Sequence, residues 1–349
     1  MRIIVVGATG NVGTSVLESL AADDRVTSIV GIARRLPTDH APKVEWRRGD
    51  IGTDDLAPHF QGADCVIHLA WLIQPARDLD LLWRVNVDGS ARVFRSVAEA
   101  GVPSLVYASS IGAYSPAPKA RPIDESWPTN GIRTSFYARH KAEVERKLDR
   151  FEREHRDVRV VRLRPALTFK RESAAEQRRL FAGPFLPTPL VRPGVLPFVP
   201  DVPGLRFQAV HTADVGDAYR RAALGDTRGP FNIAAEPVLD PQELARVFKT
   251  RTLPMPRGLL RNVASLTWRL RLQPSPPGWV DMALLCPILD TARARLELGW
   301  EPRYTAVDAM REVAEGLQQR AGFPTPPLDH DAGGRFRKRE LSSRVGGSE

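Results

Sequence analysis

A tyrosine and a lysine four residues apart are the residues of this chain whose types and spacing most directly suggest catalysis. Tyr137 and Lys141 lie in a stretch from Ser135 to Glu154 that lacks Gly and Pro, so the stretch predicts a helix with both side chains on one face. A phenol titrates at about pH 10, and a neighbouring ammonium favours its ionised form. Tyr137 is therefore a candidate general acid or base for an alcohol or a carbonyl. An ordinary surface helix can carry the same spacing.

The N-terminus predicts a strand that leads into a helix through a glycine turn. Arg2 to Val6 is a short β-branched run, and Gly7, Gly10 and Gly13 follow it, the last two within or beside an amphipathic segment from Asn11 to about Ala22. In a dinucleotide-binding turn the first glycine permits the bend, the second lets the pyrophosphate approach, and the third lets the helix pack on the strand. The helix N-terminus then faces the anion. A glycine turn without a ligand is the alternative.

The second predicted strand, from Val26 to Ile32, is followed by two arginines. An acidic residue here binds the adenosine ribose in enzymes that prefer NAD, whereas an arginine accommodates the 2′-phosphate of NADP. The chain has Arg34 and Arg35 and no acid at this place. We therefore expect NADP(H), with NAD less favoured and Arg34 the better candidate. Two arginines that merely solvate a loop would look the same.

A serine pair follows a later apolar strand. Residues 104–114 predict the fifth strand and its exit loop, which contains Ser109 and Ser110. Ligands of open parallel sheets bind beyond the carboxyl ends of the strands, so Ser110 is expected in the same crevice as the glycine turn. Its hydroxyl could hydrogen-bond a substrate oxygen and stabilise developing negative charge. Ser109 is expected to be structural.

These motifs together resemble the extended short-chain dehydrogenases/reductases, the epimerase/dehydratase branch, to about Ala321. The spacing G-x-x-G-x-x-G, the pattern Ser110-x-x-x-Tyr114 and the pair Tyr137 and Lys141 carry the resemblance. It implies an α/β fold, a Rossmann-type doubly wound parallel sheet with a smaller C-terminal substrate-binding lobe. It also implies that Ser110, Tyr137 and Lys141 are catalytic, with Lys141 holding the nicotinamide ribose while a hydride passes between substrate and nicotinamide.

The motifs and the resemblance together imply a set of cofactor-binding residues. These are Gly7, Thr9, Gly10, Asn11, Val12, Gly13, Arg34, Arg35, Asp50, Ile51, Leu69, Ala70, Asn86, Tyr137, Lys141 and Pro165. Asp50 and Ile51 are similar to the family's adenine contact, although a plain turn aspartate would look alike. Leu69 and Ala70 resemble the strand end that borders the cofactor ribose, and Asn86 resembles a residue with a supporting hydrogen-bond role.

The expected domains follow the same frame. Residues 1–165 are predicted to form the Rossmann domain, to which the chain returns at 205–235. Residues 166–204, rich in proline after their first part, and 236–322 are predicted to form the substrate lobe, and 323–349 a flexible basic tail. Residues 257–289 are expected to be lid helices packed on this lobe, with a lipophilic wall or a membrane-surface helix as the alternative.

Composition limits the remaining classes. The 349 residues carry a net charge of +9, but the basic residues are mostly scattered arginines and no nucleic-acid motif is present, so we expect no nucleic-acid partner. Cys65 and Cys286 are expected to be reduced core residues. Without a leader or a long apolar run, the sequence predicts a cytoplasmic protein with no stable membrane insertion. We expect no metal, and the resemblance implies a homodimer through helices around 80–100 and 137–155.

The substrate is predicted from what the chain lacks. UDP-sugar epimerases of this branch carry an arginine where this sequence has Phe207, and a second near Trp279, so two diphosphate contacts are replaced by aromatic residues. Arg192, Arg257 or Arg261 could substitute for them. The pocket-facing candidates, besides Ser110, are Trp71, Tyr114, His211 and Trp279.

Three functions follow from these observations. The leading hypothesis is an NADP(H)-dependent oxidoreductase that interconverts a carbonyl and a secondary alcohol on a fairly apolar, non-nucleotide small molecule. The alternative is a nucleotide-sugar 4-epimerase or dehydratase with tightly bound NAD(P). A cofactor-binding protein without turnover is the third, because a fold alone does not establish activity.

Overall fold

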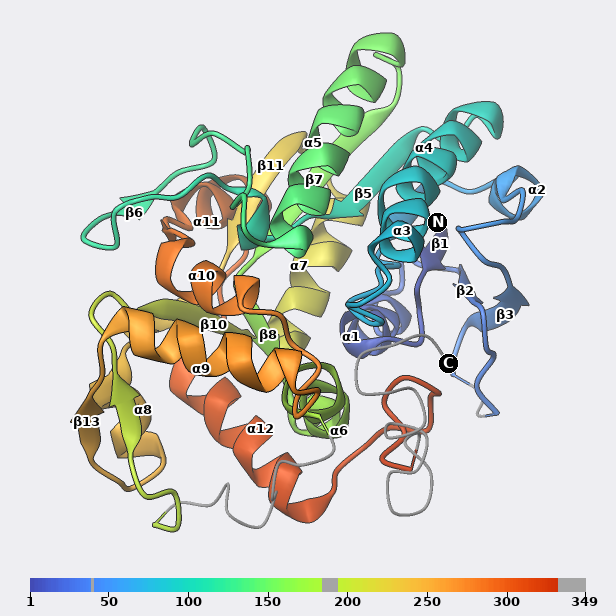
Figure 1. Ribbon diagram of the computed structural model, residues 1–349. Helices are drawn as coiled ribbons and strands as arrows, with labels where there is room; N and C mark the ends of the chain where they lie inside the picture. The colour runs from blue at the N-terminus through green and yellow to red at the C-terminus, as the bar shows by residue number, and fades with distance from the viewer. Residues whose placement is uncertain (39–40, 184–193, 332–349) are drawn as a thin grey trace.

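A seven-stranded parallel sheet forms the centre of the molecule (Figure 1). The computed structural model describes residues 1–38, 41–183 and 194–331. The strand order is β11-β7-β5-β4-β1-β2-β3, and all neighbouring strands are parallel. The strands are β1 Arg2–Val6, β2 Ser28–Ala33, β3 Val44–Arg48, β4 Cys65–His68, β5 Ser104–Ala108, β7 Arg159–Pro165 and β11 Gly229–Ile233. The predicted doubly wound α/β fold is confirmed.

Helices cover both faces of this sheet, and β1 shows how the sequence specifies this. Ile3 and Val5 belong to a core cluster that includes residues of α1 Asn11–Ala21 and α7 Thr212–Leu224. Ile4 and Val6 belong to a second cluster that includes residues of α4 Gly89–Glu99 and α5 Phe136–Glu154. Because both sides are buried, the strand reads as a continuous apolar run and not as an alternating one.

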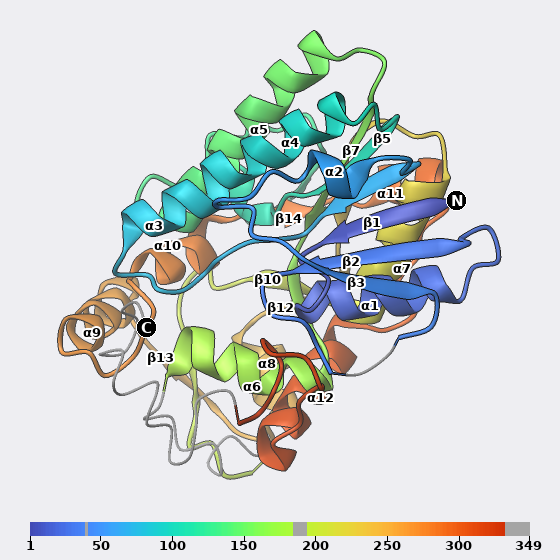
Figure 2. The same ribbon diagram turned by 90° about the vertical axis from the view of Figure 1, so that its right-hand side faces the viewer.

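The strand order reverses between β1 and β4, and this switch point opens a crevice at their carboxyl ends. The short helix α2 Ala57–Phe60 precedes β4. After β4 the chain runs through α3 Leu79–Trp83 and a π-helical turn, Arg84–Asp88, into α4. α4 and α5 lie side by side on one flank of the molecule (Figure 1, Figure 2). Pairing of two copies through these helices stays a prediction.

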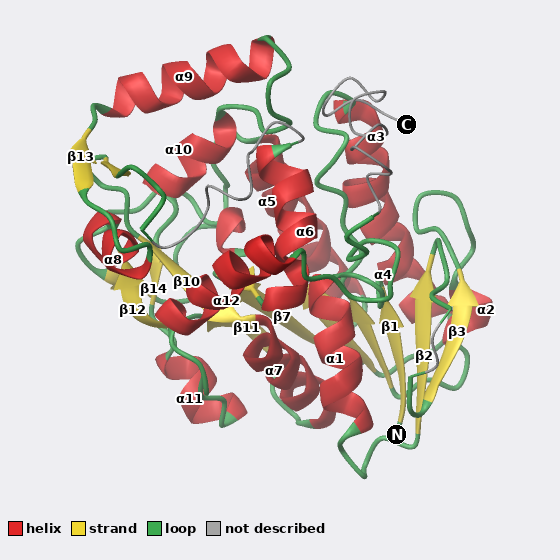
Figure 3. Cartoon of the chain, turned by 90° about the horizontal axis from the view of Figure 1, so that it is seen from below, coloured by secondary structure: helices red, strands yellow, loops and turns green. Residues whose placement is uncertain are grey.

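The second lobe is built from short strands and small helices. β8 Leu167–Phe169, β10 Phe207–His211 and β12 Ala235–Leu239 form a three-stranded sheet. Two strand pairs accompany it, β9 Val199–Asp201 with β13 Thr252–Pro254 and β6 Pro122–Ile123 with β14 Ile288–Leu289. The helices that follow β8 and β11 in sequence are α6 Ala174–Gln177, α8 Pro241–Val247, α9 Arg257–Arg269, α10 Gly278–Leu285, α11 Ala292–Leu298 and α12 Ala306–Gln319. Figure 3 shows α8, α9 and α10 grouped to one side of the central strands.

Two boundaries differ from the sequence prediction. β10 pairs with β8 and β12, so of the segment 205–235 only α7 and β11 return to the central domain. The residues after 322 also do not begin a free tail, because Thr325 and Leu328 are buried and the Thr325 hydroxyl donates to the Thr9 carbonyl over 2.8 Å. The sequence does not indicate this packing, because the segment 323–331 contains three prolines and few apolar residues. Residues 332–349 lie outside the described residues.

Two further expectations concern the cysteines and membrane-spanning helices. Cys65 and Cys286 are free and buried, as predicted. Among the described helices, none combines the length and the apolar character needed to cross a bilayer.

Candidate active site

The glycine turn places backbone groups at the switch point between β1 and β4. Gly7 has a φ of +87°, and a Cβ there would lie 2.6 Å from the Ala70 nitrogen. A Cβ on Gly13 would lie 2.5 Å from the Gly7 carbonyl oxygen, whereas one on Gly10 would meet only that oxygen at 3.7 Å. Gly7 and Gly13 are therefore fixed by close packing, and Gly10 leaves open space at the start of α1.

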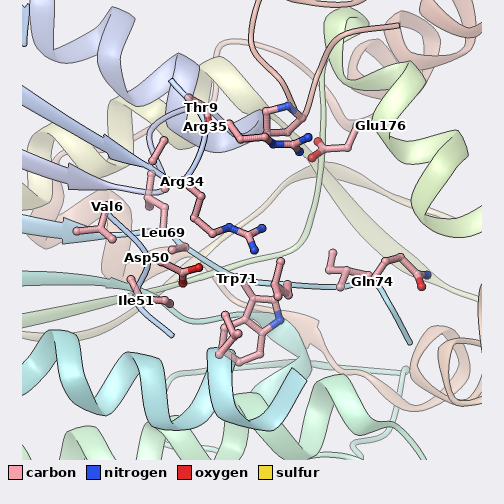
Figure 4. Close-up of a pocket in the computed structure, with 18 of the residues that line it drawn as sticks. Val6, Thr9, Arg34, Arg35, Asp50, Ile51, Leu69, Trp71, Gln74 and Glu176 are labelled. Atoms are coloured by element: carbon pink, nitrogen blue, oxygen red, sulfur yellow. The ribbon is translucent and has the colours of Figure 1, made fainter. Parts of the chain in front are cut away.

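A cavity of about 690 Å³ adjoins this turn, within the range of roughly 300–1,000 Å³ typical of small-molecule sites (Figure 4). Of the predicted cofactor-binding and substrate-binding residues, ten line it: Gly7, Thr9, Gly10, Arg34, Arg35, Asp50, Ile51, Leu69, Ala70 and Trp71. The lining of the cavity, as far as the chain is described, does not include Asn11, Val12, Gly13, Asn86, Ser110, Tyr137, Lys141 or Pro165.

The structure adds residues to the cavity that the sequence did not single out. Arg48 joins Arg34 and Arg35, because β3 pairs with β2 in a register that sets Ala33 beside Arg48. Glu176 and Arg179 reach it from the second lobe, and Pro327 from the segment after α12. Figure 4 shows Arg34 extending into the cavity near Asp50. Only the tertiary fold brings these distant segments together, so no local motif could reveal them.

The three predicted catalytic residues come together beyond β5. Ser110 lies in the loop after β5, where its Oγ accepts a hydrogen bond from the Gly112 nitrogen over 3.0 Å. Its hydroxyl is also a hydrogen-bond partner of the Tyr137 phenol. On α5, which Ser135 caps by accepting from the Ala138 nitrogen, Lys141 donates from Nζ to the Ala108 carbonyl over 2.6 Å. The fold thus groups residues from two separate segments.

Burial controls the ionisation of this group. It raises the pKa of Tyr137 to about 12, while the hydrogen bond from Ser110 opposes the rise. Burial also lowers the pKa of Lys141 to about 7, against the attraction of Glu145. The Nζ of Lys141 lies 5.9 Å from the centre of the Tyr137 ring. We expected the Lys141 ammonium to stabilise a Tyr137 phenolate, and this is not what the pKa values indicate. Burial removes water from both groups, and this favours the neutral form of each more strongly than their mutual attraction favours the charged forms.

Aromatic side chains surround the group and separate it from the cavity. Trp71 lines the cavity, and its ring centre lies 3.6 Å from Nζ of Lys141 and 5.8 Å from the Tyr137 ring. Trp279 covers the other side, with its ring 5.0 Å from Tyr137 and 4.8 Å from Phe181. Trp71 therefore stands between Lys141, a candidate catalytic residue, and the space that the glycine turn borders.

Hydrogen bonds from behind hold this arrangement. Asn86 accepts from the Leu72 nitrogen and donates to the Leu72 carbonyl, both over 2.7 Å, and so fixes the loop that carries Trp71. A supporting role of Asn86 at a cofactor site stays a prediction. Glu145 is buried, which by itself would raise its pKa, but Arg164 and Arg162 lower that pKa to about 2. Ser109 donates to Glu145 and is structural, as expected.

A family model identifies the chain. The model of the NAD dependent epimerase/dehydratase family matches residues 3–181, which is more than half of the sequence and includes the glycine turn and all three catalytic candidates. This chain belongs to that family. It is accordingly an enzyme of the extended short-chain dehydrogenase/reductase kind, as the sequence motifs predicted.

Curated relatives of this epimerase/dehydratase family member match it at moderate identity. An uncharacterized protein of Sinorhizobium fredii is 26% identical over 79% of this chain and 69% of its own length. An uncharacterized protein of Mycobacterium tuberculosis is 26% identical over 93% of this chain, which spans only 31% of that relative. L-arabinose 1-dehydrogenase (NAD(P)(+)) of Haloferax volcanii is 35% identical over 31% of this chain and 41% of its own length.

Solved structures share the fold of this epimerase/dehydratase family member. MoeE5 in complex with UDP-glucuronic acid and NAD has a TM-score of 0.67 at 19% identity, covering 91% of this chain and 99% of that one. UDP-glucose 4-epimerase of Thermus thermophilus, in complex with NAD, has a TM-score of 0.65 at 20% identity, with the same coverage of both chains. At these identities the likeness establishes the fold.

Two residues that the sequence predicted to contact substrate, Tyr114 and His211, do not line the cavity. Tyr114 is fully buried, where its hydroxyl donates to Asn232 over 2.7 Å and accepts from Arg164 over 2.9 Å. His211 caps α7 by accepting from the Ala213 nitrogen, and its other ring nitrogen lies 2.9 Å from a Glu312 oxygen. Both side chains use their polar atoms in packing contacts, so we withdraw their assignment to the substrate pocket.

The arginines that could replace the missing diphosphate contacts also have other partners. Arg257 donates to the Pro203 carbonyl over 2.5 Å, and Arg261 pairs with Asp281 over 2.9 Å. Arg192 lies outside the described residues. Trp279, at the place where a second arginine was expected, packs directly on Tyr137.

Proposed function

We propose that this enzyme transfers a hydride between a nicotinamide dinucleotide and a substrate carbon that bears a hydroxyl or carbonyl group. One observation carries the proposal. Ser110, Tyr137 and Lys141 come together beyond β5, and only the Trp71 side chain lies between Lys141 and the cavity that the glycine turn borders. A phenol, a serine hydroxyl and a lysine in this arrangement suit acid–base chemistry at an oxygen-bearing carbon. The third possibility, binding without turnover, has no observation in its favour.

The residues present fit a dinucleotide. Gly7 and Gly13 have no room for a side chain, Gly10 borders open space, and the first turn of α1 directs its free backbone N–H groups to the same side. We propose that this turn holds the pyrophosphate, that Asp50 and Ile51 border the adenine, and that Lys141 holds the nicotinamide ribose. The dinucleotide would supply or accept the hydride.

The chain's own groups handle the proton. With a pKa of about 12, Tyr137 is protonated at neutral pH and can donate to a substrate oxygen that gains negative charge. Ser110, held by the Gly112 nitrogen, can hydrogen-bond the same oxygen. In the opposite direction the phenol has to lose its proton first, so we expect that direction to gain rate as pH rises. Trp71 and Trp279, the latter backed by Phe181, shield this group in part, and Tyr137 stays half-buried.

For the cofactor we propose NADP(H). Arg34, Arg35 and Arg48 line the end of the cavity next to Asp50, and they could pair with a 2′-phosphate. Asp50, the carboxylate beside Arg34, is partly engaged, because it accepts from the Gly52 nitrogen over 2.8 Å. The family model and the NAD-bound structural relatives favour NAD, which is therefore the competing cofactor.

Two overall reactions share this chemistry, and different observations favour each. The family match, relatives solved with UDP-sugars and a dTDP-glucose 4,6-dehydratase of similar fold favour a nucleotide-sugar 4-epimerase or dehydratase, in which the cofactor is reduced and reoxidised within one turnover. The aromatic wall of Trp71, Trp279 and Phe181 favours net oxidation or reduction of a less polar small molecule. The comparisons give the epimerase or dehydratase the stronger support.

Native mass spectrometry of the purified protein, followed by titration with NADPH, NADH, UDP and dTDP, distinguishes the two. Protein that arrives with bound NAD and binds UDP or dTDP supports the epimerase or dehydratase. Empty protein that prefers NADPH and does not bind either nucleotide supports the net oxidoreductase. If none of the four compounds binds to correctly folded protein, the proposed function is wrong.

A further inference from the structure

Helix α9 carries its apolar side chains on the outside. Leu259, Val263, Leu266 and Leu270 recur at the spacing of one helical face, and they are 50%, 49%, 56% and 60% exposed. Every residue of α9 is described, and none of them is buried. Figure 3 shows α9 along one edge of the molecule, away from the central sheet. Large contiguous apolar faces of this kind mark interaction surfaces.

The inward face of the same helix combines an ion pair with contacts of one tryptophan. Arg261 points to the body of the protein and pairs with Asp281 over 2.9 Å. Trp268 lies under the guanidinium of Arg77, 3.5 Å from its ring centre, and its carbonyl accepts from Arg77 over 2.5 Å. The helix is thus anchored by an ion pair, a cation–π contact and the packing of Trp268 on an apolar cluster, while Leu259, Leu266 and Leu270 stay exposed.

The charge around this face has one sign. From residue 244 to residue 280 the sequence contains seven lysines and arginines and no aspartate or glutamate. Arg269 and Arg271 are exposed at the C-terminal end of the leucine face, and Arg257 at its start. A second copy of the chain would bring Arg257, Arg269 and Arg271 against their own counterparts, which disfavours a symmetric dimer here. The complementary occupant is an anionic surface with an apolar interior.

We propose that α9 docks this enzyme on anionic lipid bilayers, with the leucine face in the acyl boundary and the arginines at the headgroups. Amphipathic helices with an apolar face and basic flanks bind membranes in this way without crossing them. The segment that follows this helix reaches the cavity. Pro274, shortly after α9, lines the cavity, and its carbonyl accepts from Gln74 over 3.1 Å. The proposal holds whichever substrate the enzyme uses.

Vesicle sedimentation with purified full-length protein tests this. We compare vesicles of phosphatidylcholine alone with vesicles that contain one third phosphatidylglycerol. The wild type is expected to bind the anionic vesicles and to bind the neutral ones far more weakly. The triple variant Leu259→Ser, Leu266→Ser, Leu270→Ser is expected to lose roughly tenfold or more in partitioning, because its apolar contact is gone while its charge is unchanged. Arg269→Gln with Arg271→Gln is expected to lose roughly fivefold per arginine.

The single variant Leu266→Ser is expected to weaken binding to anionic vesicles, though less than the triple variant does, and Leu296→Ser is its matched control. Leu296 is 85% exposed on α11, toward the edge opposite α9 in Figure 3, and its replacement should leave vesicle binding unchanged. Melting temperature and dinucleotide binding report on folding in every variant.

Four results would overturn the proposal. The first is a wild type that does not bind anionic vesicles. The second is a triple variant that binds them as strongly as the wild type does, because binding would then be assigned to the basic C-terminal segment. The third is a fall in melting temperature confined to the α9 serine variants, which would mean that the chain itself covers this face. The fourth is a dimer in sedimentation velocity that the triple variant dissolves.

Discussion

The two ends of the candidate site differ in how far water reaches them. At the adenosine end Arg34 and Arg35 are exposed on loops beside an open cavity. At the catalytic end Lys141 is buried beneath Trp71, and its pKa falls to about 7. An anion can therefore meet the first end as it stands, whereas a ligand reaches Lys141 only after Trp71 moves. Binding and catalysis should respond separately to mutation if this difference is real.

The largest expected effect is at the catalytic end. Tyr137→Phe should lower turnover by a factor of roughly one hundred to ten thousand, the usual contribution of a positioned proton donor. Dinucleotide affinity should change little, because Tyr137 does not border the cavity in the described chain. Steady-state kinetics and NADPH titration check this.

Tyr114→Phe is the matched control for that variant. It removes a phenol hydroxyl from the same neighbourhood, but that hydroxyl serves Asn232 and Arg164. The control should lose stability and keep its turnover per folded molecule. Equal loss of turnover in both variants would contradict the catalytic role of Tyr137.

The adenosine end should respond in binding and specificity alone. Arg34→Ala should weaken NADPH roughly ten- to a hundredfold, since a hydrogen bond to a charged group contributes about 1.5–3 kcal/mol. NADH affinity should stay within about a factor of two, because no 2′-phosphate is lost. Fluorescence titration with both cofactors measures the ratio. Arg121→Ala, an equal charge change at an exposed residue outside the cavity lining, should leave that ratio unchanged. Parallel losses for both cofactors would rule out NADP selectivity by Arg34.

The two ends were also unequally accessible to prediction from sequence. Gly7, Gly10 and Gly13 lie in one local turn whose geometry depends on glycine itself, so their spacing is informative without a fold. The fold class could also be predicted from local patterns, because short apolar strands lead into amphipathic helices along the chain. Arg48 illustrates the limit, because only the pairing of β3 with β2 brings it beside Ala33.

The catalytic end depends on contacts between distant segments. Trp279 reaches Tyr137 from the far lobe, and Trp71 covers Lys141 through a loop that Asn86 fixes. The sequence located Tyr137 and Lys141, but their ionisation is set by burial, which no spacing encodes. Tyr114 was misassigned because a pattern cannot tell a side chain that enters the pocket from one that turns into the core.

Trp71 itself offers a smaller effect that joins the two ends. Trp71→Ala should tighten dinucleotide binding by roughly two- to thirtyfold, because a ligand no longer displaces the indole from the Lys141 ammonium, a contact of about 0.5–2 kcal/mol. Isothermal titration measures the change. Trp83→Ala, which removes an exposed indole outside the cavity lining, is the control. Weaker binding in Trp71→Ala alone would mean that the indole is part of the binding surface and not an obstacle to it.

The smallest expected effect concerns stability at the catalytic end. Because burial lowers the Lys141 pKa to about 7 from its ordinary value of 10.5, the unfolded chain binds the extra proton more readily between these values. Stability from this group therefore rises as pH increases from about 7 to about 10.5, and the penalty is largest near and below pH 7. Lys141→Met should remove the penalty and raise the melting temperature by a few degrees at pH 7, where about 1 kcal/mol corresponds to roughly 2–4 °C. That gain should shrink at pH 9.5.

Lys170→Met separates this explanation from a general effect of buried lysines. Lys170 is also buried, but its ammonium donates to the Thr14 and Ser15 hydroxyls over 2.7 and 3.1 Å. Removing it leaves those hydroxyls without their donor, so this variant should melt lower and not higher. If the buried charge of Lys141 destabilises the fold, the changes in melting temperature at pH 7 have opposite signs in the two variants. Thermal melts of both variants at pH 7 and pH 9.5 measure these changes. A lower melting temperature for Lys141→Met at pH 7 would instead mean that its contacts with Ala108 and Trp71 outweigh the loss of water around its charge.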